Sequence, residues 1–462
     1  MGHTGDPNLR TPQMDRLAAD GVSLTQAYAN CPVCTPSRGT IFSGRHAHAG
    51  PVQGFFDVFK ASSPSTATLL RDAGYHTAYF GKWHCGVIRD QVPPEMRETE
   101  GRPGKPYWPQ RTPEYHRGGF QDWYGFEVNN APFNGFYYQG NETNLHWMKK
   151  YQTDELTDLA IQYLRDYDRE EPLFLVLSVE PPHFPLEAPK EYKRFDTAGL
   201  QTRPNFTDSP EMRAQLATYY AMIENLDANI GRLRDALKAQ ESFKDNTLTV
   251  YFSDHGDYMG SHGIFQRKEY PHEESVRIPA IFHWPEQIPA RGLTRGLWSL
   301  VDLLPTTLGL AGVEMPDHLQ GRDFSSLLRG EEFVLPTDVL LEMVGNPRWS
   351  LDLLDWRGLV TDRWKYAFFE TGHEWLFDLQ SDPYELHDLS ATRPEVCAAL
   401  KTRLLDMLRE TREPYFDVLI EHGAKPLTPV KDVSAAGPSL LVPCAAKLSP
   451  AWKDMVRRAP DA

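Results

Sequence analysis

Apolar positions along the chain switch repeatedly between the two-residue period of β-strands and the period of about 3.6 residues that marks α-helices. This alternation is typical of an α/β domain with a mainly parallel central sheet flanked by helices. Up to residue 335 it predicts helices at residues 12–20, 65–73, 153–167, 211–237 and 300–310. It predicts strands at residues 75–80, 173–179, 247–252 and 278–284.

The pattern changes near Pro336. Beyond this residue, short antiparallel strands with tight turns are predicted, and a helix follows them, at residues 356–361, 365–370, 375–379 and 394–409. A chain of 462 residues also exceeds what one hydrophobic core usually serves. We therefore expect a catalytic domain at residues 1–335 and a smaller α+β subdomain, built on a short antiparallel sheet, at residues 336–462.

One long segment, at residues 89–149, is polar, rich in proline and aromatic residues, and without clear periodicity. A segment of this length inside a compact domain is more often a functional insertion than a plain connector. We expect it to help shape a substrate pocket. The proline-rich tail beyond Glu413 is expected to be irregular.

Charge and composition argue against two classes of partner. The formal net charge is −15, whereas binding to nucleic acid depends mainly on lysine and arginine side chains that neutralise phosphates. No apolar run is long enough to span a bilayer, so the sequence predicts no membrane segment. The first residues show neither the basic nor the apolar region of a signal peptide, and the compartment stays open.

The five cysteines are too few and too scattered for a disulfide framework, so we expect reduced thiols. Two of them stand in Cys31-Pro-Val-Cys34, a spacing shared by redox motifs and by half of many zinc sites. The context argues against both interpretations. The next cysteine, Cys85, is solitary, and a thioredoxin-like fold is far smaller than this chain.

Polar side chains follow three of the predicted strands directly. They are Lys82 and His84 after residues 75–80, His183 after residues 173–179, and Asp254 with His255 after residues 247–252. In open α/β sheets, ligands bind beyond the carboxyl ends of the strands. We therefore expect these separate segments to direct their side chains into one crevice.

Each of these groups has a functional and a structural interpretation. Asp254 and His255 suit a divalent cation, but an aspartate at such a turn also accepts backbone N–H bonds. Lys82 and His84, two residues apart in an extended segment, would face the same side and could grip an anion, or could lie in a solvated loop. The residues alone leave both alternatives open.

Two further residues carry a weaker signal. His183 could donate a proton to a leaving group, although a lone histidine between prolines is more often a packed or capping residue. Lys268 stands in a charged stretch and, taken alone, has the character of a surface cation. Only the presence of the other polar motifs in the same chain favours a functional role for these two residues.

The run Cys34-Thr-Pro-Ser-Arg-Gly-Thr-Ile-Phe-Ser-Gly-Arg45 resembles the signature of the type I sulfatases of the alkaline phosphatase superfamily. In that family the cysteine is converted to formylglycine (3-oxoalanine) by a separate formylglycine-generating enzyme. The resemblance continues in the family's order over nearly the whole chain, through Gly81-Lys-Trp-His84, His183-Phe-Pro, Ser253-Asp-His-Gly256, Lys268 and the segment from Leu376 to Glu385. It implies an alkaline-phosphatase-like fold and release of sulfate from a sulfate ester.

The resemblance also implies a role for each matched residue. Cys34, as the formylglycine hydrate, attacks sulfur, Arg38 holds the hydrate, and His84 positions it. Lys82 and Lys268 bind sulfate oxygens. Fixed cations are suited to this reaction, because negative charge grows on the bridging oxygen as the ester bond breaks.

The remaining roles concern proton transfer and the metal. His183 would bind sulfate and help to protonate the departing alkoxide. Asp254 and His255, together with the modified Cys34, would ligate Ca²⁺, with Mg²⁺ as the alternative ion. The resemblance leaves open whether Asp254 also activates the nucleophile.

One departure from the family concerns the metal site. In the family, a first strand ends in two aspartates that complete this site and precede the segment resembling residues 5–15. The chain begins too late to contain them, so either Met1 is an internal methionine or a central strand is truly missing; we favour the first explanation. As printed, the chain is expected to fold poorly or to bind calcium weakly.

Two rival functions remain. A phosphonate monoester or phosphodiester hydrolase of the same superfamily shares the nucleophile and the metal site, although the Cys-Thr-Pro-Ser-Arg form favours sulfate. An inactive relative would bind sulfated glycans without cleaving them, but Cys34, Arg38 and Lys268 are all present. Sulfated sugars and aryl sulfates both fit the expected chemistry.

Overall fold

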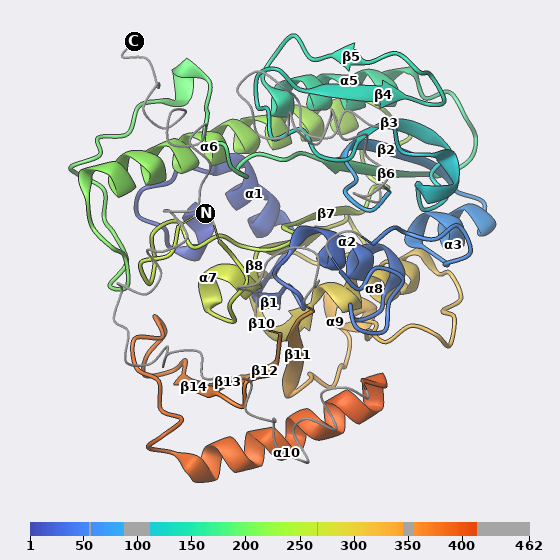
Figure 1. The fold of residues 1–462 in the computed structure, drawn as a ribbon. Helices are drawn as coiled ribbons and strands as arrows, with labels where there is room; N and C mark the ends of the chain where they lie inside the picture. Colours follow the sequence, from blue (N-terminus) through green and yellow to red (C-terminus); the bar gives the residue numbers. More distant parts are fainter. Residues whose placement is uncertain (55–56, 87–110, 266, 345–354, 414–462) are drawn as a thin grey trace.

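The computed structural model describes residues 1–54, 57–86, 111–265, 267–344 and 355–413 (Figure 1). Helices pack around two mixed sheets, and a third, antiparallel sheet with one long helix forms the C-terminal part. The helices are α1 (Pro12–Asp20), α2 (Cys34–Ser43), α3 (Thr66–Asp72), α5 (Gln152–Asp166), α6 (Pro210–Lys238), α7 (Glu273–Val276), α8 (Leu303–Ala311), α9 (Ser325–Arg329) and α10 (Pro394–Thr411). This architecture confirms the α/β prediction.

The first sheet has the strand order β10-β1-β9-β7, with β8 also paired to β1. Its strands are β1 (Val22–Tyr28), β7 (Thr249–Phe252), β8 (Arg277–Ile278), β9 (Ala280–His283) and β10 (Gly292–Ser299). β1 runs parallel to β10, whereas β9 is antiparallel to both β1 and β7. The predicted strand at residues 278–284 is thus divided into β8 and β9.

The second sheet has the order β5-β4-β3-β2-β6. Its strands are β2 (His76–Lys82), β3 (Asp122–Phe126), β4 (Phe136–Gln139), β5 (His146–Trp147) and β6 (Leu173–Ser178). β2 lies between β3 and β6 and is parallel to both. Three of these strands lie within residues 89–149, which show no clear periodicity in the sequence; of that segment, residues 89–110 lie outside the described residues.

The two sheets end on β6 and β7, and no pairing between described strands joins these edges. Every residue of both strands is only partly buried, although Phe174 of β6 and Val250 of β7 pack against the same hydrophobic cluster. An edge strand leaves a row of backbone N–H and C=O groups unpaired. Among the described strands, the expected central sheet is therefore divided between β6 and β7.

Local sequence signals account for several helix ends. Ser209 caps α6, since its side chain accepts the backbone N–H of Met212 at 3.1 Å, and Pro210 takes the first helical position. Ser65 and Thr68 form a capping box at the start of α3. Helix α1 has the predicted bounds, and the other predicted helices lie within a few residues of theirs.

The C-terminal sheet has the order β11-β12-β13-β14 and is antiparallel throughout. Its strands are β11 (Asp338–Met343), β12 (Trp356–Thr361), β13 (Trp364–Phe369) and β14 (Glu374–Asp378). One face packs with residues of β1 and β10, among them Tyr28 and Leu297, and the other face packs against α10. The expected antiparallel sheet and helix are confirmed, whereas the tail beyond Glu413 lies outside the described residues.

A buried ion cluster joins the segment after α2 to β11. Glu342 on β11 is fully buried, and its carboxylate lies 2.7 Å from His48 Nδ1 and accepts the N–H of Ala47 at 2.7 Å. Arg357 and Glu413 border the same cluster. Burial lowers the pKa of His48, but the Glu342 carboxylate outweighs this effect, and the net direction is upward.

We expect His48→Gln to destabilise the protein more in mild acid than in alkali. A histidine whose pKa is raised on folding contributes stability that is fully present below its unfolded pKa of about 6.5 and is lost as the pH rises through the folded value. Losing the charged contact to Glu342 should cost about 1–3 kcal/mol at the acid end. Burial keeps the pKa of neighbouring His46 at about 4, so His46 does not titrate in this window.

Denaturant unfolding at a series of pH values measures this effect. The difference in unfolding free energy between wild type and variant should narrow as the pH rises. A difference that stays constant with pH would mean that His48 carries no charge in the folded protein.

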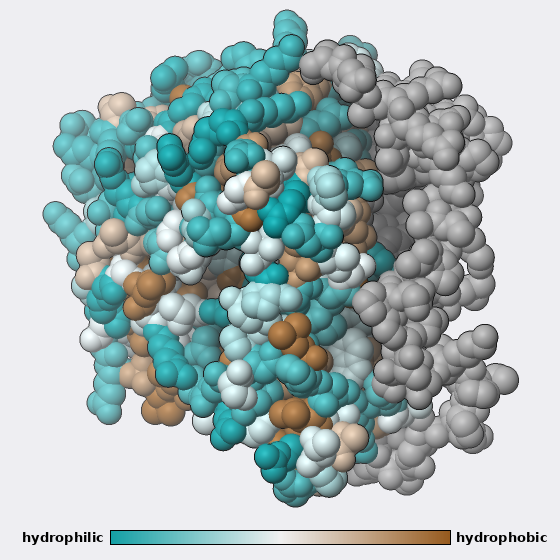
Figure 2. Space-filling view, turned by 90° about the vertical axis from the view of Figure 1, so that its left-hand side faces the viewer, coloured by the Kyte–Doolittle hydropathy of each residue, from teal (hydrophilic) through white to brown (hydrophobic). Residues whose placement is uncertain are grey.

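Among the helices within the described ranges, none is both long and apolar enough to cross a bilayer. The face of the molecule in Figure 2 is largely hydrophilic, and its apolar residues lie in small separate groups.

Candidate active site

The predicted site residues meet where three strands end beside the start of α2. β2 ends at Lys82, His183 lies in the segment after β6, and Asp254 stands two residues beyond the end of β7. Cys34 is the first residue of α2, and every residue of this helix is buried. Separate segments of the chain therefore bring their polar side chains to one point, as the positions of the motifs predict.

Cys34 lies at the centre of this arrangement and is 2% exposed. Its Sγ lies 3.1 Å from His255 Nε2 and 3.3 Å from Lys268 Nζ. Lys268 Nζ lies in turn 3.2 Å from His183 Nε2. A lysine whose sequence context suggests a surface cation is thus buried, with its ammonium against the predicted nucleophile.

The surroundings of Cys34 favour negative charge. Burial alone would raise the pKa of its thiol, but the positive charges of Lys268 and Lys82 outweigh this effect and hold the pKa well below the ordinary value. The start of a helix adds unpaired N–H groups and the positive end of the helix dipole. A buried position with these neighbours suits an anionic group.

Arg38 lies one turn after Cys34 on α2, and its side chain contacts three of the segments that form the site. Its Nη1 donates to the carbonyl oxygen of Lys82 at 2.7 Å and to Ser178 Oγ at 3.0 Å, and its Nε lies 3.3 Å from the Asp254 carboxylate. Burial alone would raise the pKa of Asp254, but His255 and Arg38 lower it to about 2. Arg38 therefore ties α2 to the ends of β2, β6 and β7.

His255 is oriented by its own backbone neighbourhood. Its Nδ1 lies 2.8 Å from the carbonyl oxygen of Gly256, which leaves Nε2 directed at Cys34. The Cys34 sulfur, one Asp254 oxygen and one His255 nitrogen all lie within 4.8 Å of one another. The predicted metal ligands are thus brought together.

The segment that carries Lys82 and His84 differs from the extended form that the sequence suggests. β2 ends at Lys82, and His84 has a left-handed backbone with φ of 58°. Both side chains are nevertheless buried at the site. Burial lowers the pKa of His84 to about 4, against the opposing effect of a hydrogen bond to Cys34.

His183 follows a tight turn of prolines. The Pro181-Pro182 and Phe184-Pro185 peptide bonds are cis, and His183 Nδ1 lies 2.6 Å from the carbonyl oxygen of Phe184. Burial lowers the pKa of His183, and the charge of Lys268 lowers it further. The Nε2 atom is the one that faces Lys268 and the site.

The structure adds residues that the sequence analysis does not single out. Ser37 donates to the carbonyl oxygen of Asp254 at 2.6 Å, and Ser178 donates to that of Lys82 at 3.0 Å. Glu180 lies 3.8 Å from Lys82 Nζ. Glu180 stands directly before the Pro-Pro-His183 motif, and this proximity is the one sequence signal that could point to it.

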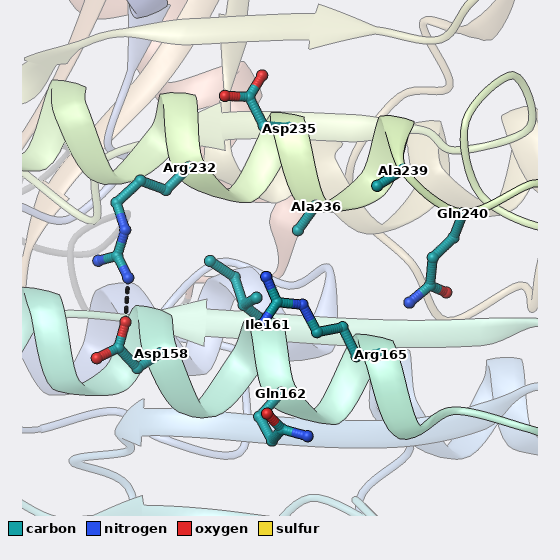
Figure 3. Close-up of a pocket in the computed structure, with 9 residues that line it drawn as sticks. All are labelled: Asp158, Ile161, Gln162, Arg165, Arg232, Asp235, Ala236, Ala239 and Gln240. Carbon is teal, nitrogen blue, oxygen red and sulfur yellow. Dashed lines mark hydrogen bonds and ion pairs between the residues drawn. The ribbon is translucent and has the colours of Figure 1, made fainter.

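The described cysteines form no disulfide, and one pocket lies apart from this arrangement. In the described part of the chain, Cys31, Cys34, Cys85 and Cys397 are free thiols. A pocket of about 590 Å³ between α5 and α6 is crossed by the ion pair of Asp158 and Arg232 (Figure 3). None of the predicted site residues lines it.

Comparison with known proteins places this geometry in a family. Residues 1–313 match the Sulfatase family, and residues 260–413 match the family of N-sulphoglucosamine sulphohydrolase C-terminal regions. The chain is 30% identical to the ulvan-active sulfatase of Formosa agariphila, over 84% of this chain and 74% of that protein. It is 29% identical to the endo-4-O-sulfatase of Bacteroides thetaiotaomicron, over 89% of this chain and 87% of that one.

The fold of the chain is also that of a sulfatase. The structure superposes on the crystal structure of a candidate sulfatase, yidJ, from Bacteroides fragilis with a TM-score of 0.81 and 28% identity. The match covers 91% of this chain and 94% of that chain. In sequence over most of its length and in fold, the chain belongs to the sulfatase family and is a sulfatase enzyme.

Proposed function

We propose that the chain hydrolyses a sulfate ester through a formylglycine hydrate that is formed from Cys34 by a formylglycine-generating enzyme. The observation that carries this proposal is the convergence of Lys268, His183 and His255 on the Cys34 side chain, from segments far apart in the sequence. The Cys34 Sγ stands where the oxygens of the hydrated aldehyde would lie. Buried cations around this position suit both an oxyanion and a sulfate group.

The hydrated aldehyde supplies one hydroxyl to attack sulfur and a second whose deprotonation releases sulfate, and it thereby splits one difficult hydrolysis into two steps. Lys82 and Lys268 bind the sulfate oxygens and stabilise the charge that grows as the ester bond breaks. Arg38 and His84 hold the modified side chain in place. His183 Nδ1 donates its proton to a backbone carbonyl, so Nε2 accepts a proton from the Lys268 ammonium and passes it to the departing alkoxide.

We further propose that Asp254 and His255, together with the modified Cys34, hold a divalent cation, Ca²⁺ or alternatively Mg²⁺. Asp254 is ionised at neutral pH, since its pKa is about 2, and its oxygen lies close to the other two ligand atoms. Calcium takes about six to eight oxygen ligands, so this trio fits only part of a calcium shell. A bound cation would polarise the sulfate group.

For the substrate we propose a sulfated sugar. Two of the relatives are named for activity on ulvan and for endo-4-O-sulfatase activity, and both align over most of this chain. A carbohydrate also requires proton donation to its leaving alkoxide, which gives His183 a function at the site. An aryl sulfate leaves more easily and serves as a general test substrate.

Turnover of matched substrates tests the proposal. We call the protein converted when its Cys34 has been oxidised to formylglycine. The converted protein is expected to release sulfate from an aryl sulfate with a kcat/KM at least about 10²-fold above that for the matching aryl phosphate diester. A preference for the diester would assign the chain to the rival phosphodiester chemistry. Retention of a sulfated glycan with no sulfate released would indicate the inactive, binding relative.

A further inference from the structure

We propose that Glu180 is a positioning residue that holds Lys82 in the orientation needed to bind sulfate; this inference rests on the proposed function of Lys82. Glu180 lies between the end of β6 and the turn that carries His183, and it is 7% exposed. Neither the sequence motifs nor the predicted roles include it. Its carboxylate lies beside the ammonium of Lys82, a residue that is only 3% exposed.

Both oxygens of the Glu180 carboxylate are engaged. Oε1 lies 3.8 Å from Lys82 Nζ and accepts the backbone N–H of Asn129 at 3.0 Å. Oε2 accepts the backbone N–H of Asn130 at 3.0 Å and the Nε2–H of Gln152 at 2.9 Å. The carboxylate therefore joins the end of β2 to the loop after β3 and to the first residue of α5.

The backbone of Glu180 extends the same connection. Its N–H donates to Gln152 Oε1 at 2.8 Å, and its carbonyl oxygen accepts the N–H of His183 at 2.9 Å. Gln152 is itself fully buried. One residue thus fixes the position of Lys82 and shapes the turn that places His183.

The charges at the site show why an acid is needed at this position. Arg38 lies against Asp254, Lys268 lies against Cys34, and Lys82 lies against Glu180. A buried ammonium without a counterion is costly, and the flexible lysine stem has many rotamers to choose from. At 3.8 Å the carboxylate lies beyond normal hydrogen-bond distance, so it orients Lys82 while leaving the ammonium protons available to a sulfate oxygen.

Glu180→Gln is the direct test. Glutamine keeps the size of the side chain, but it removes the charge and turns an amide NH₂ toward groups that are all donors. In converted protein we expect inorganic sulfate, measured as a competitive inhibitor, to bind about 10-fold more weakly and kcat/KM for an aryl sulfate to fall by about 10- to 100-fold. Glu180→Asp, which keeps the charge but shortens the reach, should lose less.

A double-mutant cycle separates positioning from plain structural support. If Glu180 acts through Lys82, then Glu180→Gln should change sulfate inhibition and kcat/KM by less than about 2-fold in a Lys82→Gln background. Equal losses in both backgrounds would overturn the inference. If Glu180→Gln does not fold, Glu180→Asp is carried through the same cycle with the same expectation.

Glu342→Gln is the matched control, because Glu342 is another buried carboxylate that holds a cationic side chain and a backbone N–H, at a cluster apart from Cys34. It should lower thermal stability while leaving sulfate inhibition unchanged. A wild-type protein that hydrolyses sulfate esters while Glu180→Gln is unaffected refutes only the role of Glu180. A converted wild-type protein without sulfatase activity refutes the proposed function instead.

Discussion

Replacing Cys34 with alanine is expected to reduce turnover of a sulfate ester by about 10⁵- to 10⁶-fold, the loss that follows removal of a covalent nucleophile. Alanine cannot be oxidised to the aldehyde, so neither hydroxyl of the hydrate can form. Lys82, Lys268 and His183 would remain and could still bind the sulfate group. Steady-state kinetics with an aryl sulfate, together with a sulfate-binding assay, would show lost turnover with retained binding.

Cys31→Ala provides the matched control within the same Cys-x-x-Cys motif. Cys31 is fully buried and packs in a cluster with Tyr28, Val33 and residues of the C-terminal sheet. Burial raises the pKa of its thiol to about 12, so it is not poised for chemistry. Its variant should keep activity within about 3-fold per folded molecule. Equal losses at both cysteines would point to a structural role for the motif.

The second large effect is expected at Lys268. Lys268→Met keeps most of the buried aliphatic volume but removes the ammonium that lies beside Cys34 and His183. We expect kcat/KM to fall by about 10²- to 10⁴-fold, since one preorganised charge on the transition state is lost. The loss should appear mainly in kcat if Lys268 contacts the charge that develops, and mainly in KM if it only binds the substrate.

Lys365→Met is a suitable control because Lys365 on β13 is also a buried lysine, paired with Glu273 of α7 and with Glu385 beyond β14. Breaking this buried pair should cost about 3–5 kcal/mol of stability, with kcat/KM per folded molecule unchanged. A comparable fall in kcat/KM for both variants would mean that the effect of Lys268→Met comes from the fold and not from the site.

The helices and strands with strong periodicity could be predicted from the sequence, whereas the central elements around the site could not. β1 (Val22–Tyr28) mixes polar and apolar residues, and most of it is buried because it lies between two paired strands and its side chains pack into two hydrophobic clusters. α2 (Cys34–Ser43) has no apolar stripe, because all of its faces are buried. Periodicity reports contact with solvent on one face, so it gives no signal for elements that are buried all round.

The site was predictable to the extent that its motifs follow strand ends. Lys82, His183 and Asp254 meet as the rule for open α/β sheets requires. The burial of Lys268 depends on a loop, which no periodicity describes. Glu180 is engaged by groups from three other segments, and such a contact set exists only in the folded chain.

The most direct test of the account is the mass of the tryptic peptide at residues 17–38, from protein made together with a formylglycine-generating enzyme. This peptide contains both Cys31 and Cys34. We predict a loss of about 18 Da at Cys34, the conversion of a thiol to the aldehyde that covalent catalysis requires, with Cys31 still open to alkylation. Two unmodified thiols, under conditions where a control sulfatase is converted, would contradict a formylglycine nucleophile in this protein.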